Sequence, residues 1–350
     1  MMNNLSPEEI LRAKEAEGGI EFEDSIGMEN TEIPNIPDSP VNNIDMDSGP
    51  VENNNVSNSL GKSKGFEKSS RILETGWKNL PVGLLPSGGR YYPEGTEIAI
   101  RPAEVSEIKH FSTVEEDDVS SVSEALNFIL SRCMKMNFPG EGVVDYRDII
   151  QEDRFFIVMA IRDLTFINGE NRIILKPKVK CKETRKCPYT SGFELKTGVL
   201  DFFSISERVM GYYSEEERCF SFTLRTEPED PIKLSIPTIG VTDLIYNFIE
   251  RNKSKLKEED RSFLKIAPFI FPEWRELSDS VIFAEMRKSD YWSKERFSLF
   301  YKMSNELKTG TRLNAKIECP ECKGSIEAPI VFKDGIKSIF VISDIFGQLL

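Results

Sequence analysis

Hydrophobic residues recur at helical spacing in two long segments of the N-terminal half. Apolar side chains three and four positions apart predict one amphipathic helix from Val119 to Asn137 and a second from Tyr146 to Phe166. A short apolar run before them predicts a strand at Ile98–Ile100. We expect the two helices to form a layer that packs its apolar stripes into a core.

From about residue 173 the pattern changes to short strands. Strands are expected in the residues leading into Cys181 and in three later segments, Leu195–Phe202, Phe220–Leu224 and Ile232–Ile236. Helical spacing returns at Val241–Glu250 and Arg296–Leu307, and a last hairpin is predicted from Thr311–Glu318 and Ile326–Phe332. The pattern predicts an α+β fold with a helical layer, strand hairpins, and a helical insert between two cysteine-bearing hairpins.

The first 74 residues follow neither pattern. Within residues 1–70 there are 14 acidic and five basic residues, a net charge of −9 out of −13 for the whole chain. Such a segment has too few large apolar side chains to offset the entropy lost on folding. We therefore predict a disordered acidic tail over 1–74, an N-terminal arm and helical subdomain over 75–170, and an α+β subdomain over 171–350.

One short helix is predicted inside this tail. Ser6 and Glu9 form a capping-box pattern, and the flanking Leu5 and Ile10 can pack together as a hydrophobic staple. A helix of this length is marginal alone in water, so we expect it to fold on a partner through Leu5, Ile10 and Leu11. The alternative is a frayed acidic end in which the spacing arose by chance.

Composition narrows the class of protein. The net charge of −13 disfavours a general affinity for nucleic acid or anionic membranes. No apolar run approaches the ~20 residues of a membrane span, and the N-terminus lacks the pattern of a signal peptide. We therefore expect a reducing compartment, in which the cysteines are not joined as disulfides.

Four cysteines form two close pairs. Cys319 and Cys322 are separated by two residues, the spacing of a zinc knuckle, while Cys181 and Cys187 are separated by five. We predict that the four thiolates bind one structural Zn²⁺. The alternative is four reduced thiols buried like small hydrophobic side chains, and Cys219 is a possible replacement for one of the predicted ligands.

The remaining chemistry predicts no enzyme. A site closed by four thiolates leaves no coordination position for an activated water. The chain has a single histidine, His110, which lies in a polar stretch and is interpreted as a surface or loop residue. The sequence contains no phosphate loop, dinucleotide fingerprint or nucleophile elbow. We therefore predict no catalytic residues and no small-molecule substrate.

A lysine-rich run precedes and enters the first cysteine loop. Its basic residues are Lys176, Lys178, Lys180, Lys182, Arg185 and Lys186. This run is the basis of an alternative function, a zinc-ribbon protein that binds nucleic acid through phosphate contacts. No aromatic residues for base stacking are interleaved with this run. Its lysines lie at every second position, which favours the solvent-exposed face of a strand.

Three further segments are distinctive: Leu85–Pro93 with the strand and Pro102 after it, the strand into Cys181 and Cys187, and Ile317–Val331 with its Cys-Pro-x-Cys turn. Together they resemble the baseplate hub and hub-assembly proteins of T-even-type bacteriophages. The wide first cysteine pair, the acidic tail and the C-terminal nine residues depart from the family pattern. The resemblance implies a structural or chaperone-like assembly protein of a contractile-tail baseplate, with other hub and tail proteins as partners. It also implies a location in the host cytoplasm during assembly or in the virion.

Overall fold

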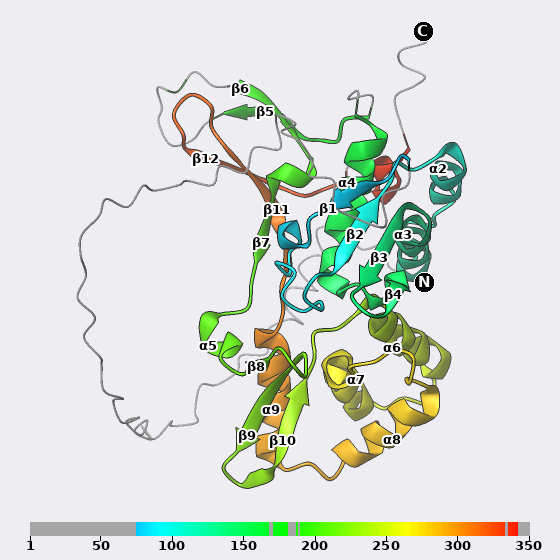
Figure 1. The fold of residues 1–350 in the computed structure, drawn as a ribbon, viewed down its shortest axis with the longest axis vertical. Coiled ribbons are helices and arrows are strands. Elements are labelled where there is room, and N and C mark those ends of the chain that lie inside the picture. Colours follow the sequence, from blue (N-terminus) through cyan, green and yellow to red (C-terminus); the bar gives the residue numbers. More distant parts are fainter. Residues whose placement is uncertain (1–74, 168–170, 181–186, 188–189, 333–334, 342–350) are drawn as a thin grey trace, which may run out of the picture. The chain divides into compact units, whose positions relative to one another are not determined.

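The structure is a computed structural model of the 350-residue chain. Helices alternate with antiparallel sheets (Figure 1), which confirms an α+β fold. The predicted tail with Leu5, Ile10 and Leu11 lies outside the described residues. The structure describes residues 75–167, 171–180, 187, 190–332 and 335–341.

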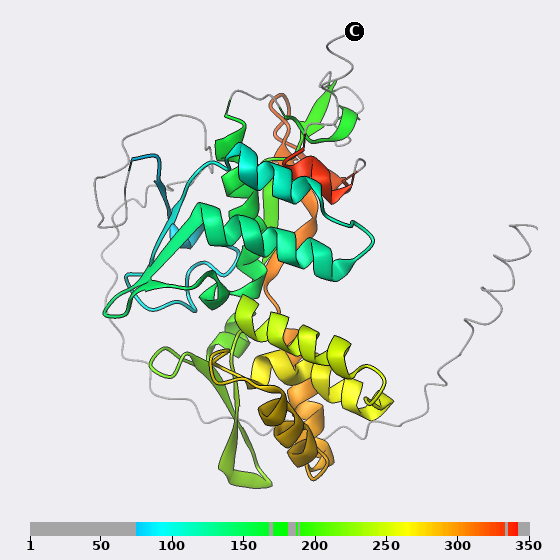
Figure 2. The ribbon, with the colours of Figure 1, turned by 90° about the vertical axis from the view of Figure 1, so that its right-hand side faces the viewer.

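A four-stranded antiparallel sheet comes first, with its strands in the order β1-β2-β3-β4. Its members are β1 (Lys78–Leu80), β2 (Glu97–Ile100), β3 (Met134–Phe138) and β4 (Gly142–Val144). Between β2 and β3 the chain forms α2 (Val105–Ser112) and α3 (Val119–Cys133), which lie side by side (Figure 2). The strand predicted at Ile98–Ile100 is thus confirmed as the greater part of β2.

The first predicted helix is shorter than expected. It ends at Cys133, and the residues predicted to form its last turn are the strand β3 instead. From Met134 to Phe138, apolar and polar residues alternate, and buried and half-buried side chains alternate with them. This period of two belongs to a strand, and pairing with β2 satisfies its backbone groups.

The second predicted helix begins later than expected. Two 3-10 turns, η2 (Tyr146–Asp148) and η3 (Gln151–Asp153), precede α4 (Arg154–Thr165). The Ile150 N–H donates to the hydroxyl of Tyr92 at 3.1 Å, and the Gln151 N–H donates to the carbonyl of Pro237 at 2.9 Å. Partners distant in sequence therefore take backbone groups that a continuous helix would use internally.

The arm before β2 is held by one buried carboxylate. Within the arm lies η1 (Val82–Leu84). Asp153, at the end of η3, accepts hydrogen bonds from the Ser87 N–H at 2.8 Å, the Ser87 hydroxyl at 2.7 Å and the Tyr92 hydroxyl at 2.7 Å. These bonds connect the arm to the helical part of the chain 60 or more positions later.

Both cysteine-bearing hairpins are present. β5 (Ile174–Lys180) pairs with β6 (Thr190–Glu194), and β11 (Gly310–Glu318) pairs with β12 (Ser325–Pro329), both antiparallel. In Figure 1 the β5–β6 hairpin lies beside β12, and the two hairpins are in contact.

The strand expected at Leu195–Phe202 is interrupted. The turn η4 (Thr197–Val199) precedes β7 (Leu200–Phe203), which pairs antiparallel with β11 in the order β12-β11-β7. Asp163 accepts hydrogen bonds from the Thr197 N–H and hydroxyl. Because Asp163 lies in α4, these bonds hold the turn against that helix.

A long insert separates β7 from β11. It includes α5 (Glu207–Met210), β8 (Tyr213–Ser214), β9 (Cys219–Leu224), β10 (Glu227–Leu234), α6 (Ile239–Asn252), α7 (Glu258–Ile270), α8 (Asp279–Ser289) and α9 (Lys294–Glu306). The predicted helical insert is therefore confirmed, although the hydrophobic pattern did not predict α7 and α8. α7 contains Pro268, a residue that disfavours the interior of a helix, and its first turn is acidic, so the pattern of its apolar residues is less clear.

The buried apolar side chains form two clusters. The larger one extends from Leu80 to Phe340, which follows the turn η5 (Ile336–Ile339). The smaller one lies among α6, α7 and α8 and contains Phe248, Phe263 and Ile282. Trp292 packs against both clusters, so the insert has a core of its own that is joined to the main one.

Candidate metal centre

The second cysteine pair lies on the tight turn between β11 and β12. The last pair of the ladder is Glu318 with Ser325. Beyond it, the Cys319 N–H donates to the Gly324 carbonyl at 2.7 Å, and the Lys323 N–H donates to the Cys319 carbonyl at 2.9 Å. Lys323 has a φ of 62°, the left-handed conformation that closes the turn. The strand pairing therefore places Cys319 and Cys322 on one small loop.

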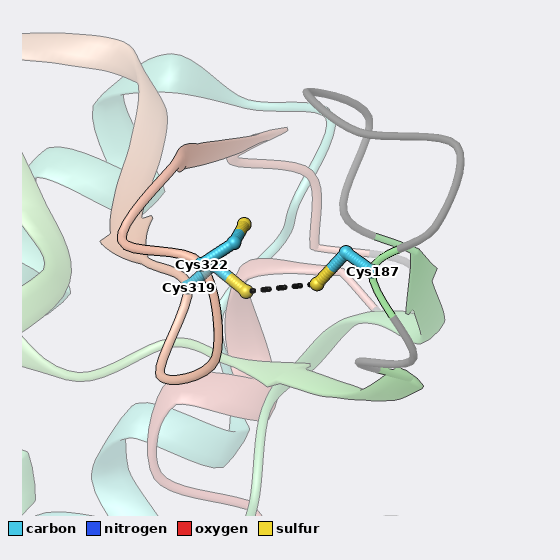
Figure 3. Close-up of side chains that lie close together, drawn as sticks. All are labelled: Cys187, Cys319 and Cys322. Atoms are coloured by element: carbon cyan, nitrogen blue, oxygen red, sulfur yellow. Dashed lines mark hydrogen bonds between the residues drawn. The ribbon is translucent and has the colours of Figure 1, made fainter.

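Cys187, from the loop between β5 and β6, approaches this turn. Its Sγ is 3.7 Å from the Sγ of Cys319, although the two residues are 132 positions apart. Figure 3 shows Cys187 facing the turn that carries Cys319 and Cys322. The three sulfur atoms all lie within 4.8 Å of one another. Cys319 is fully buried, and Cys187 and Cys322 are half-buried.

This geometry fits a tetrahedral thiolate site. Sulfur ligands about 2.3 Å from a zinc ion, at the corners of a tetrahedron, lie about 3.8 Å from one another. The 3.7 Å between Cys187 and Cys319 matches that separation. Three cysteines of the predicted set can therefore bind one metal ion with little movement, while the identity of the metal is not given by the geometry.

The turn also stabilises the ligand form of Cys319. Burial by itself raises the pKa of a thiol, but here hydrogen bonds outweigh it. The backbone N–H groups of Cys322 and Glu321, together with the neighbouring thiols, lower the pKa of Cys319 from 9.0 to about 7. Since the thiolate is the form that binds metal, the turn favours a metal ligand at Cys319. These two amide donors were not predicted from the sequence, although the Cys-Pro-x-Cys spacing could have indicated them.

The other cysteines have different surroundings. Cys181 lies outside the described residues. Cys219 is buried in β9, where its Sγ is 3.5 Å from a carboxylate oxygen of Glu217, and it does not belong to the thiol cluster. Burial raises the pKa of Cys219 and raises that of Cys133, in the core, to about 12. These two thiols therefore stay protonated, and the alternative ligand Cys219 is wrong for this cluster.

His110 lies apart from the thiol cluster. It is exposed on α2, with its ring 3.9 Å from the ring of Phe128, so it is a surface residue as the sequence predicts.

Comparison with known proteins identifies no relative. No protein-family model, curated protein or solved structure matches this chain. Among the described residues, no helix has the length and apolar character needed to cross a membrane.

Proposed function

We propose that the cysteine cluster binds one structural Zn²⁺ and that Cys181 supplies the fourth thiolate. The observation that carries the proposal is the 3.7 Å approach of Cys187 to Cys319 from hairpins 132 positions apart. Thiolates select soft metals such as zinc. Four of them saturate the ion, so the site stabilises structure and leaves no position for an activated water.

The metal would join the ends of a long excursion of the chain. The β5–β6 and β11–β12 hairpins flank the insert, and bringing them together costs loop-closure entropy. A metal bound by both hairpins offsets this cost. The insert is then held at both ends as a rigid platform, which suits a protein that acts through contacts with other proteins.

The function we propose is a structural or chaperone-like role in the hub of a contractile-tail baseplate, acting through other hub and tail proteins. The support is the sequence resemblance in three segments. The first of these, Leu85–Pro93, packs its Ser87 and Tyr92 against the buried Asp153. The other two segments contain the cysteines of the cluster. The proposal requires neither substrate nor catalytic group.

Metal analysis tests the site. We expect the purified chain to contain one equivalent of zinc, and Cys319→Ser to lose it, because a serine hydroxyl does not replace a thiolate as a zinc ligand. Cys219→Ser is the matched control, since that thiol is buried outside the cluster. Elemental analysis that finds no metal in the parent protein, or equal metal in both variants, would contradict a zinc site.

Tail assembly tests the biological role. A phage that lacks this chain is expected to accumulate incomplete baseplates, and the chain is expected to copurify with other tail proteins. Mass spectrometry of mature virions distinguishes a resident component from an assembly factor that leaves. If phage that lack the chain still form normal, infectious tails, the proposed role in assembly is wrong.

The second candidate function is nucleic-acid binding. Its support is the lysine-rich strand β5, which ends in the first cysteine loop. A gel-shift assay at low salt tests it, because phosphate contacts weaken steeply as salt rises. Retention of DNA or RNA that falls with salt would favour this function, and no retention at low salt would exclude it.

A further inference from the structure

We infer that Cys187 and Cys319 also form a disulfide under oxidising conditions once the metal has left. This inference rests on the proposed metal site and adds a second chemical state to it. In one state a metal ion joins the two hairpins, and in the other a covalent bond joins them. The two hairpins therefore stay linked whether the surroundings are reducing or oxidising.

The geometry allows a bond between the hairpins. The Sγ atoms of Cys187 and Cys319 are 3.7 Å apart and in direct contact, while a disulfide requires about 2.05 Å. Cys187 is half-buried and lies outside the strands, so a side-chain rotation can close much of this gap. Cys319, by contrast, is held by two backbone hydrogen bonds of its turn.

Within this pair of cysteines, exposure sets the order of the chemical steps. A peroxide reaches the half-buried Cys187 before the fully buried Cys319. The Cys187 thiolate attacks one peroxide oxygen, the O–O bond breaks, and hydroxide leaves, so that Cys187 becomes a sulfenic acid. The Cys319 thiolate then attacks the Cys187 sulfur, and the S–S bond forms as the S–O bond breaks and a second hydroxide leaves.

The overall reaction is balanced with hydrogen peroxide as the oxidant. Two thiols and one peroxide give one disulfide and two waters, and two electrons pass from the sulfur atoms to the peroxide oxygens. No other reactant is needed. For a protein that is made in a reducing cell and then released to an oxidising exterior, this reaction preserves the link when zinc is lost.

Peptide mapping of the whole chain tests the inference. The protein is treated with EDTA, oxidised with hydrogen peroxide, blocked with iodoacetamide and digested with trypsin without reduction. We expect the peptide 187–196 to be joined to the peptide 317–323. Because the second peptide contains two cysteines, Cys322→Ala should retain this cross-link, Cys319→Ala should lose it, and Cys219→Ala should leave it unchanged.

Hydrogen exchange supplies a second readout that does not depend on variants. Amides of β6 should exchange slowly in the zinc form, faster after EDTA under reducing conditions, and slowly again after oxidation. A disulfide between Cys319 and Cys322 or between Cys181 and Cys187, or exchange in the oxidised chain as fast as in the reduced metal-free chain, would overturn the inference. Zinc content, measured separately before oxidation, reports on the metal site alone.

Discussion

Asp153 is the residue on which the N-terminal arm depends. It is fully buried, and its carboxylate accepts three hydrogen bonds from Ser87 and Tyr92. Burial raises the pKa of Asp153 to about 6 from 3.8, and the hydrogen bonds offset only part of that rise. The folded protein thus binds this proton more tightly than the unfolded chain does.

We expect the contribution of Asp153 to stability to fall as pH rises. A carboxyl whose folded pKa is raised stabilises the fold below its unfolded value of 3.8, and this stabilisation is lost as pH rises through about 6. The shift corresponds to about 3 kcal/mol. Asp153→Asn removes the charge and should flatten the pH dependence of the free energy of unfolding between pH 4 and 7, as measured by urea denaturation.

Other carboxyl groups titrate over the same range, so the test compares two variants. Asp117→Asn, at an exposed position, should follow the pH dependence of the parent protein. If Asp153→Asn follows it too, Asp153 is ionised in the folded protein with an ordinary pKa, and the burial argument is wrong.

At the scale of elements, α6 packs closely because of one glycine. A Cβ atom on Gly240 would lie 2.5 Å from Cγ of Trp274. That indole donates its N–H to Asp148 at 2.8 Å, and Arg275 donates two further bonds to the same carboxylate. The indole therefore cannot move away without breaking a partly buried hydrogen bond.

We accordingly predict that Gly240→Ala destabilises the protein. Overpacking costs about 1–3 kcal/mol, which exceeds the gain of at most about 1 kcal/mol from replacing a helical glycine. Gly83→Ala is the control, because its Cβ would meet no atom within 4 Å. Thermal melting should show a lower midpoint for Gly240→Ala only, and equal midpoints would mean that the indole yields freely.

Arg296 joins the β9–β10 hairpin to α9. The Nη1 atom of Arg296 is 2.7 Å from the Glu227 carboxylate and 2.9 Å from that of Asp230. The hydroxyl of Ser293, which caps α9, donates to the same Glu227 side chain at 2.8 Å. One nitrogen of the guanidinium thus bridges two carboxylates of the hairpin.

Arg296→Lys should loosen this hairpin without unfolding the protein. We expect faster hydrogen exchange in β9 and β10, because the lysine side chain is shorter than that of arginine and its ammonium would lie farther from the two carboxylates. Arg287→Lys, whose exposed ion pair with Asp290 spans 3.7 Å, should change exchange nowhere in this hairpin. Unchanged exchange in Arg296→Lys would show that the strands hold the hairpin by themselves.

At the scale of the molecule, the proposed metal and the core of the insert would stabilise different parts. The insert has its own apolar cluster among α6, α7 and α8, whereas the thiols join the β5–β6 and β11–β12 hairpins. Removing zinc with EDTA should therefore increase hydrogen exchange in these hairpins but leave the helical circular dichroism signal nearly unchanged. A large loss of helix on chelation would mean that the metal is needed for the whole fold.

Local pattern by itself determined several features of this protein. The start of α3, the β11–β12 hairpin and its two-cysteine turn follow from side-chain periodicity and spacing within a few residues. Each depends on contacts close along the chain, which is the information that a sequence pattern contains.

Tertiary structure decided the rest. The helical spacing of Tyr146–Phe166 is broken because Tyr92 and Pro237 take its backbone groups, and the start of β3 is extended because β2 pairs with it. The meeting of Cys187 with Cys319 likewise depends on how two distant hairpins pack. Such long-range competition for hydrogen bonds and burial leaves no mark in local periodicity, so only the folded chain reveals it.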